Sequence, residues 1–418
     1  MFNTIKNAWK IPDLRKKMIF TLLMLAIFRL GSFIPVPGMD RAALAQLIES
    51  GGLLGFFDVI SGGAFKNFAI FAMNITPYIN ASIIMQLLTI AIPSLEALAK
   101  EGEEGRKKIA QYTRYGTVVL ALIQAIALSI GLKNYLIAQD FVSISLVAVS
   151  LTAGTAFLMW LGELITEKGV GNGISLIIFA GIVSRIPVGA ANLLQLYKVK
   201  TVSIFELVGF LIVAILIIMG IVVIQEGQRR IPVQYAKRVV GRKMYGGQSS
   251  HIPLKVNQAG VIPVIFAMSI IEFPKQIVGF FPNSGAYNFF NKYFAWGTGV
   301  HGVLYALLII GFTYFYTAVT FNPIEVANNI KKYGGFIPGI RPGRPTAEFI
   351  QRSLSRITLV GAVFLAFIAI IPIFLMTFTN IKIFFGSTSL LIVVSVAMET
   401  VQQIEAQMIM RNYEGFLK

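Results

Sequence analysis

Long apolar stretches recur along the chain and alternate with polar or basic segments. A helix needs roughly 20 mainly apolar residues to cross the hydrocarbon core of a bilayer. The candidate stretches cover residues 18–36, 70–92, 115–132, 144–165, 174–188, 206–225, 259–279, 301–321, 356–377 and 386–407. The fifth stretch is short, and the second and seventh are interrupted. The pattern predicts an all-α polytopic membrane protein with ten spanning helices.

The ten stretches divide into two sets of five, which places an N-terminal half at 1–188, a C-terminal half at 189–407 and a tail at 408–418. The second stretch of each half contains a proline, Pro77 in one and Pro263 in the other. Interrupted helices at matching places indicate an inverted repeat with its working site at the repeat interface. An ordinary kink is the alternative for either proline alone.

A glycine-rich segment precedes the second stretch. It runs from Gly51 to Phe68 and is moderately apolar. Its glycines break it too often for it to span a bilayer alone. We expect a re-entrant or half-inserted segment.

Composition agrees with a membrane protein. Hydrophobic residues make up 56% and charged residues 13%, against about 45–50% and about 25% in soluble domains. This excludes a soluble enzyme, a disordered chain and a fibrous protein. The chain has no cysteine and only two histidines, His251 and His301. These do not favour a metal site, and we expect no cofactor.

The net charge of +17 is unevenly distributed. Most of the 36 Lys and Arg residues lie in the N-terminal segment, in the loops that follow the even-numbered stretches, and near the C-terminus. Basic loops face the cytoplasm in membrane proteins. We therefore expect both termini to be cytoplasmic.

Two pairs of isoleucines share a helical face. Ile75 and Ile79 are four residues apart, as are Ile174 and Ile178. Such pairs usually face lipid or a packed core. If the two faces met at the repeat interface, they would form an apolar collar that excludes water and ions.

Two predicted cytoplasmic loops, at about 226–258 and 322–355, are long, basic and rich in Gly and Pro. Orientation alone explains basic loops but not long ones. An anionic partner such as RNA or an acidic protein surface would explain both features, and lipid head groups are the alternative. In the second loop Pro338, Gly339, Pro342 and Gly343 favour a stiff turn that presents Arg341. The glycines of 169–173 lack the spacing of a nucleotide loop, so we expect a tight turn there.

Several short segments together resemble the bacterial SecY family, the central channel subunits of the Sec protein translocase. They are Phe28–Gly38, Pro77–Ile84, Glu101–Lys107, Trp160–Glu163, Gly169–Ser175, Pro253–Asn257, Gly260–Pro263, Pro338–Gly343 and Thr388–Val393. Each is modest alone, but their order and spacing are specific from end to end.

The resemblance implies two pseudo-symmetric halves, hinged between spans five and six around an hourglass pore. A pore ring would consist of Ile75, Ile79, Ile174, Ile178, Ile265 and Ile392. A plug would lie at about 53–67 and include Phe57, Gly62 and Gly63. A lateral gate between spans two and three and spans seven and eight would carry Asn80 on one lip and Phe273 on the other.

The resemblance also implies partners. Arg341, Arg238, Arg242 and Lys243 would dock a SecA-type motor ATPase or the ribosome. Other expected partners are SecE- and SecG-type small subunits, signal peptides, nascent chains and anionic lipids. The chain would be a passive channel in the bacterial inner membrane that passes unfolded secretory polypeptides and releases transmembrane segments sideways into lipid, and it would not be an enzyme.

An ion-coupled solute transporter with inverted repeats is the alternative. Such transporters place charged residues within their spans, where substrate and ion bind. Only Arg29 and Glu399 look deep in a predicted span. This sparse set argues against an ion relay.

Overall fold

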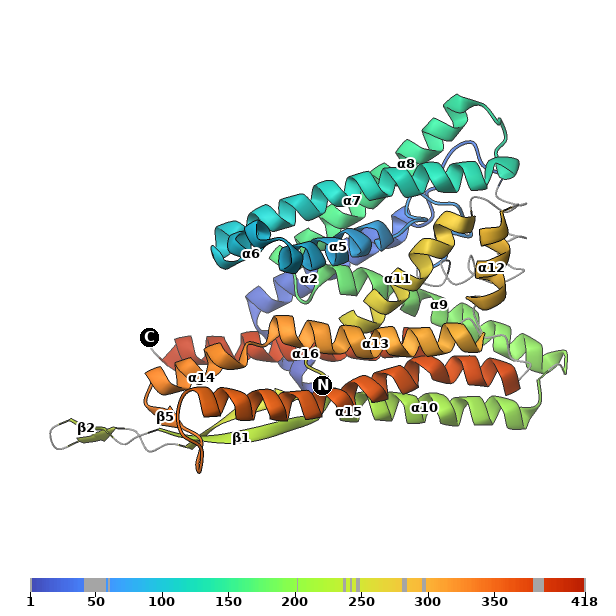
Figure 1. Ribbon diagram of the computed structural model, residues 1–418. Coiled ribbons are helices and arrows are strands. Elements are labelled where there is room, and N and C mark those ends of the chain that lie inside the picture. Colours follow the sequence, from blue (N-terminus) through green and yellow to red (C-terminus); the bar gives the residue numbers. More distant parts are fainter. Residues whose placement is uncertain are drawn as a thin grey trace.

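The computed structural model describes residues 2–40, 58, 61–200, 202–235, 238–240, 243–245, 249–279, 284–294, 298–378 and 387–416. The architecture is helical, and one helix corresponds to each predicted span (Figure 1). These helices are α2 (Pro12–Gly31), α5 (Thr76–Ala91), α7 (Glu103–Gly131), α8 (Phe141–Lys168), α9 (Gly173–Lys198), α10 (Ile204–Glu226), α11 (Ile262–Gly279), α13 (Gly299–Thr320), α15 (Arg344–Phe378) and α16 (Ser387–Phe416). Shorter helices are α1 (Phe2–Lys10), α6 (Pro93–Lys100), α12 (Gly285–Tyr293), α14 (Pro323–Lys332) and the 3₁₀ turn Lys133–Tyr135.

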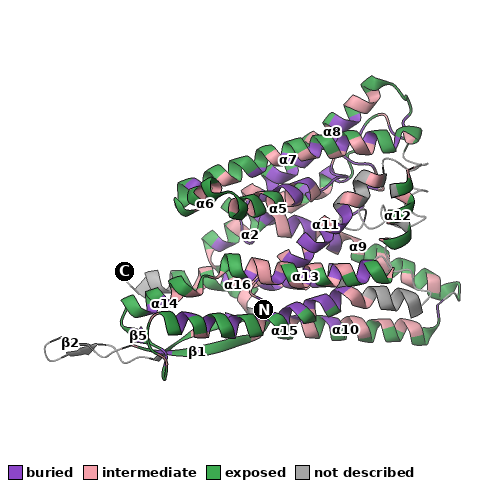
Figure 2. Cartoon of the chain, viewed as in Figure 1, coloured by how far each residue is buried: buried purple, intermediate pink, exposed green. Residues whose placement is uncertain are grey.

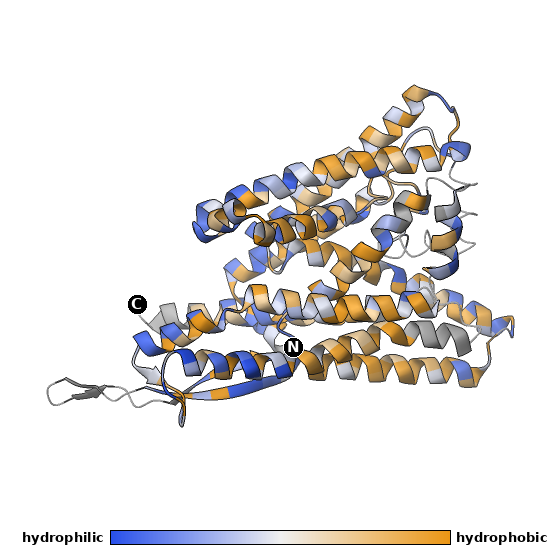
Figure 3. Ribbon diagram, in the orientation of Figure 1, coloured by the Kyte–Doolittle hydropathy of each residue, from blue (hydrophilic) through white to orange (hydrophobic). Residues whose placement is uncertain are grey.

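Within the described residues, seven helices are long and apolar enough to span a membrane by themselves, or eight if α5 and α6, bent by 99°, count as one. The helices α2 and α11 complete the set: α2 carries charges at both ends, and the apolar part of α11 is short. Large apolar side chains such as Leu22, Phe141 and Phe205 are exposed. Figure 3 shows this apolar surface along the helices and hydrophilic residues gathered toward the end that carries α6, α14 and the strands.

The two prolines mark helix starts and not kinks inside a helix, and the second apolar stretch is non-helical up to residue 75. Pro77 is the second residue of α5, and Pro263 is the second residue of α11. Proline loses no helical hydrogen bond in the first turn, because the N–H groups there have no intrahelical acceptor. Prolines lie inside helices at Pro187 in α9, Pro274 in α11 and Pro372 in α15.

The fifth span is also longer than expected. The helix α9 has 26 residues and continues to Lys198. The expected boundary between halves at residue 188 therefore lies inside a helix, one residue after Pro187. The tail expected at 408–418 likewise continues α16, which ends at Phe416.

The helices form two groups that meet in the centre of the molecule. In Figure 1, α5, α7 and α8 lie above, α10, α13 and α15 lie below, and α9 and α11 lie between them. The helix α9 contacts α2 and α8 of its own half and α10 and α16 of the other, while α11 contacts both α5 and α13. Figure 2 shows buried residues concentrated along these central helices and exposed ones on the outer faces.

The two long basic loops are joined by a small β-sheet, which the sequence analysis did not predict. Strands β4 (Ser249–Lys255), β1 (Gln228–Tyr235) and β5 (Gly335–Phe336) form an antiparallel sheet in that order. A second pair consists of β2 (Arg238–Val240) and β3 (Lys243–Tyr245). Ile231 and Leu254 of the sheet pack on Ile330 of α14 and Ile350 of α15. The loops are therefore one folded unit at the end of the bundle.

Candidate pore and docking face

The six isoleucines expected at the pore belong to one apolar cluster. Ile75, Ile178 and Ile392 are buried in it, and Ile79, Ile174 and Ile265 pack against it. They come from α5 and the residue before it, from α9, from α11 and from α16, so both halves contribute. We call these six residues the isoleucine collar. Side chains of this kind can close a passage by excluding water.

A close contact between two helices positions the collar residues of α9. A Cβ atom on Gly173 would clash with the carbonyl oxygen of Gly162 in α8. The start of α9 can therefore pack this closely against the α8 backbone only because residue 173 is glycine. Gly171 has a φ of +88°, which confirms the predicted tight turn. Asn172 caps α9, since its side chain accepts a hydrogen bond from the N–H of Ser175 at 3.2 Å. Ile174 follows directly in the first turn.

Residues 61–67 of the plug segment form turns. Residues 61–65 and 71–75 are buried, and Gly62 and Gly63 have φ values of +66° and +92°. A Cβ atom on Gly62 would touch the backbone of Gly181 in α9. Gly181 follows Ile178 by one helical turn, so the plug segment lies directly beside the collar. Phe57 lies outside the described residues.

Backbone hydrogen bonds connect the end of this segment to the chain that follows α2. The N–H of Val36 donates to Phe68 at 2.9 Å, and the N–H of Ile70 donates to Ile34 at 2.9 Å. Residues 70–75, which follow these bonds, form turns before α5 begins. That this segment is re-entrant or half-inserted in the bilayer stays a prediction.

The two helices expected to flank a lateral gate are in contact, because α5 packs against α11. Asn80 is buried on α5. Phe273 lies within α11, but its side chain is outside the described residues, so the expected Asn80–Phe273 contact stays a prediction. Glu272, its neighbour in sequence, is buried.

Arg341 occupies an exposed turn between β5 and α15. The N–H of Ile340 donates to Ile337 at 3.0 Å, and the hydroxyl of Thr346 donates to the Arg341 carbonyl at 2.9 Å. Gly339 and Gly343 have φ values of +80° and +103°. The predicted glycine turn is therefore present on both sides of the arginine.

The other expected docking residues are only partly described. Arg238 pairs with Tyr245, and Lys243 pairs with Val240, in the β2–β3 ladder. Their side chains lie outside the described residues, as does all of Arg242. Arg238 and Lys243 stand at opposite ends of this three-pair ladder, which lies at the far end of the folded loops (Figure 1).

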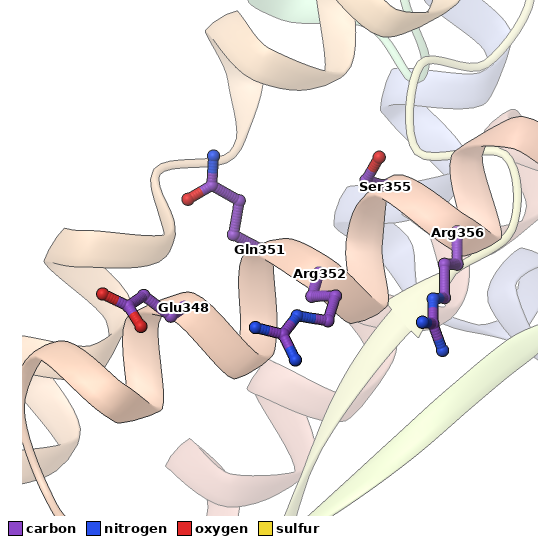
Figure 4. Close-up of a pocket in the computed structure, with 5 residues that line it drawn as sticks. All are labelled: Glu348, Gln351, Arg352, Ser355 and Arg356. Atoms are coloured by element: carbon purple, nitrogen blue, oxygen red, sulfur yellow. The ribbon is translucent and has the colours of Figure 1, made fainter.

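Sequence reasoning did not single out a polar hollow on the first half of α15. It has a volume of about 440 Å³ and is lined by Glu348, Gln351, Arg352, Ser355 and Arg356. Figure 4 shows both arginines projecting from the same helix beside a strand. Their spacing of four residues was the available signal. The hollow carries two cations, Arg352 and Arg356.

Sequence reasoning also missed a charged group on the plug. Asp58 forms an ion pair with Arg185 of α9. Arg29 donates to the carbonyl of Gly62 at 2.5 Å. Sequence analysis could not identify the pair, because Asp58 and Arg185 are far apart in the sequence and no motif relates them. Arg29 was recognised only as a deep charge.

Comparison with known proteins identifies the relationship. The family model described as SecY matches residues 69–401. The Protein translocase subunit SecY of Halalkalibacterium halodurans is 52% identical over 432 residues and covers 100% of both chains. The subunit of the same name from Escherichia coli is 46% identical over 419 residues, covering 98% of this chain and 95% of that one.

Solved structures share the fold. One described as a protein conducting channel has a TM-score of 0.70 at 20% identity and covers 97% of each chain. A channel in the canine ribosome-channel complex from the endoplasmic reticulum has a TM-score of 0.65 at 18% identity, again covering 97% of each. At these identities the likeness concerns the fold alone.

Proposed function

The chain belongs to the SecY family of protein translocase subunits, and we propose that the isoleucine collar and the plug segment form the closed seal of its protein-conducting pore. As a member of this family it is a channel subunit and not an enzyme. The ion-coupled transporter considered from sequence is thereby replaced. The unfolded secretory chain is the cargo, and the collar is the narrowest point it passes.

One observation carries this proposal: six isoleucines from both halves share a single apolar cluster beside the plug segment. An apolar constriction resists hydration, so it blocks ions while empty. Isoleucine side chains make no specific polar contact with a passing polypeptide. They therefore suit a ring that must fit around many sequences.

Lateral release requires the two halves to separate along one side. The contact between α5 and α11 joins them there. Both helices begin with a proline in the first turn, next to collar residues Ile75 and Ile265. Movement of either helix would therefore displace the collar and separate α5 from α11 at the same time. A hydrophobic segment could then pass between the two helices into the lipid.

The cytoplasmic partners are proposed from charge and exposure. Arg341 is exposed in a glycine turn, and Arg352 and Arg356 line the polar hollow on α15. Such a cationic face suits ribosomal RNA or an acidic surface of a SecA-type motor. The canine structural neighbour is part of a ribosome-channel complex, which supports a ribosome as a partner. SecE- and SecG-type subunits would pack on the apolar outer surface, and anionic lipids would surround the basic end.

We place the chain in the bacterial inner membrane with both termini in the cytoplasm. The folded loops, α6 and α14 gather hydrophilic residues at one end of the bundle (Figure 3). The basic residues of these loops assign that end to the cytoplasm by the positive-inside rule.

Reconstitution tests the function. The chain, with its small subunits, is placed in vesicles with the motor, ATP and a secretory precursor. Protease-protected precursor should accumulate inside only when the signal sequence is intact. Uptake of small solutes without protection of precursor would contradict the proposal.

A further inference from the structure

Two arginines from different helices approach the same turn of the plug segment. Arg29 is in the last turn of α2, and its guanidinium donates to the carbonyl of Gly62 at 2.5 Å. Arg185 is in α9, two helical turns beyond the collar residue Ile178, or about 10 Å along the axis. It forms an ion pair with the Asp58 carboxylate.

The ion pair is largely removed from solvent. The Asp58 side chain is 8% exposed and the Arg185 side chain is 19% exposed. Removing one member of a buried pair leaves the other charge without compensation, which is far more costly than the loss of an exposed pair. The pairing therefore bears directly on whether this turn stays in place.

Asp58 is held within the turn that it anchors. Its carboxylate accepts the N–H of Lys66 at 2.6 Å. Its carbonyl accepts the N–H of Gly63 at 2.8 Å and the hydroxyl of Ser61 at 3.2 Å. The carboxylate cannot leave Arg185 by a simple side-chain rotation without breaking the bond to Lys66. Separation of the pair thus requires the turn itself to move.

The backbone of the turn is shaped to admit the arginine. A Cβ atom on Gly63 would lie 3.1 Å from the Arg185 guanidinium carbon, and Gly63 has a φ of +92°. Gly62 contacts the α9 backbone at Gly181 in the same way. Both glycines bring the segment against the helix that carries the arginine and the collar residue Ile178.

We propose that Asp58 and Arg185 form an ionic latch that holds the plug segment against α9 and sets the threshold for opening by a signal sequence. Arg29 supports the latch through Gly62. The inference rests on the proposed function and adds to it a pair of positioning residues. Opening exchanges a buried ion pair for hydrated charges, so a signal sequence must supply enough binding free energy to part them.

The test is a double-mutant cycle on the full channel complex in planar bilayers. Asp58→Asn keeps the shape of the side chain and removes its charge, and Arg185→Gln removes the opposite charge. Each should raise the resting ion conductance several-fold and allow export of a precursor with a defective signal sequence. Asp140→Asn, an exposed carboxylate before α8, is the matched control and should change neither.

The cycle also identifies the pair. Asp58→Asn should have the larger effect, because it leaves two guanidinium groups facing the turn. The double variant should be no leakier than Asp58→Asn, since the second change removes a charge that has already lost its partner. Arg185→Lys keeps the positive charge, so its resting ion conductance should stay much closer to wild type than that of Arg185→Gln.

Three results would overturn the latch. They are unchanged conductance in both single variants, additive effects in the double variant, or an equal effect of Asp140→Asn. Export of a precursor with an intact signal is measured in every variant. If wild-type complex exports nothing, the proposed function fails; if it exports normally while the variants do not leak, the latch alone fails.

Discussion

At the collar, Ile75, Ile178 and Ile392 are buried, and side-chain packing from several helices determines their position. At the proposed docking face, Arg341 is exposed, and backbone hydrogen bonds and glycine turns determine its position. The collar can therefore change only together with the packing around it. The docking arginine can change while the fold stays intact, which separates sealing from partner binding.

The largest expected effect comes from locking the two halves together. Asn80→Cys with Phe273→Cys should crosslink on oxidation if the Cα atoms approach within about 7 Å. The native chain has no cysteine, so no other disulfide competes. Export should stop on oxidation and return with reductant, as measured by precursor protection in vesicles.

A longer flexible crosslinker at the same two positions is the control and should permit partial export. If the short disulfide forms and export continues at the wild-type rate, α5 and α11 are not the gate.

Reversing the charge at the proposed docking face should have the next largest effect. Arg341→Glu replaces an attraction by a repulsion, so motor-driven export should fall about ten-fold or more. Folding should be unchanged, because the turn is held by backbone bonds. Export rate and thermal unfolding of the purified complex are measured together.

Arg344→Glu is a matched control for this change. Arg344 is exposed three residues later and forms only an i,i+4 pair with Glu348. An equal loss of export in both variants would show a general charge effect and not a role of Arg341.

A polar residue in the collar should have a smaller effect on export and a clear effect on sealing. Ile79→Asn places an amide in the apolar cluster and should let water enter. Resting conductance in planar bilayers should rise several-fold, and the signal-sequence requirement should relax. Ile137→Asn, in an exposed loop, should leave conductance unchanged. If Ile79→Asn conducts no more than this control, Ile79 is a packing residue and not part of the seal.

The smallest effect is expected at the start of α9. Asn172→Ala removes the helix cap bond to Ser175 and should cost about 1 kcal/mol of stability. Thermal unfolding should shift slightly, and conductance should stay near wild type. A large leak in this variant would show that the cap, and not packing against Gly162, positions Ile174 and Ile178.

Much of the fold is predictable from sequence because a bilayer imposes a simple rule. Backbone groups in lipid must be satisfied within the segment, so each long apolar stretch becomes a helix. This rule identified the ten helices in order. It did not find the starts of α5 and α11, since a proline in an apolar stretch marks either a kink or a helix start, and hydropathy alone does not distinguish them.

Only part of the candidate site can be predicted from local sequence. Helical spacing paired Ile75 with Ile79 and Ile174 with Ile178, and the prolines and glycines around Arg341 predicted its turn. The sheet joining 228–255 to 335–336 and the pairing of Asp58 with Arg185 depend on contacts between distant segments. Those contacts exist only once the helices pack, because packing alone determines which helix faces meet and which charges are removed from water.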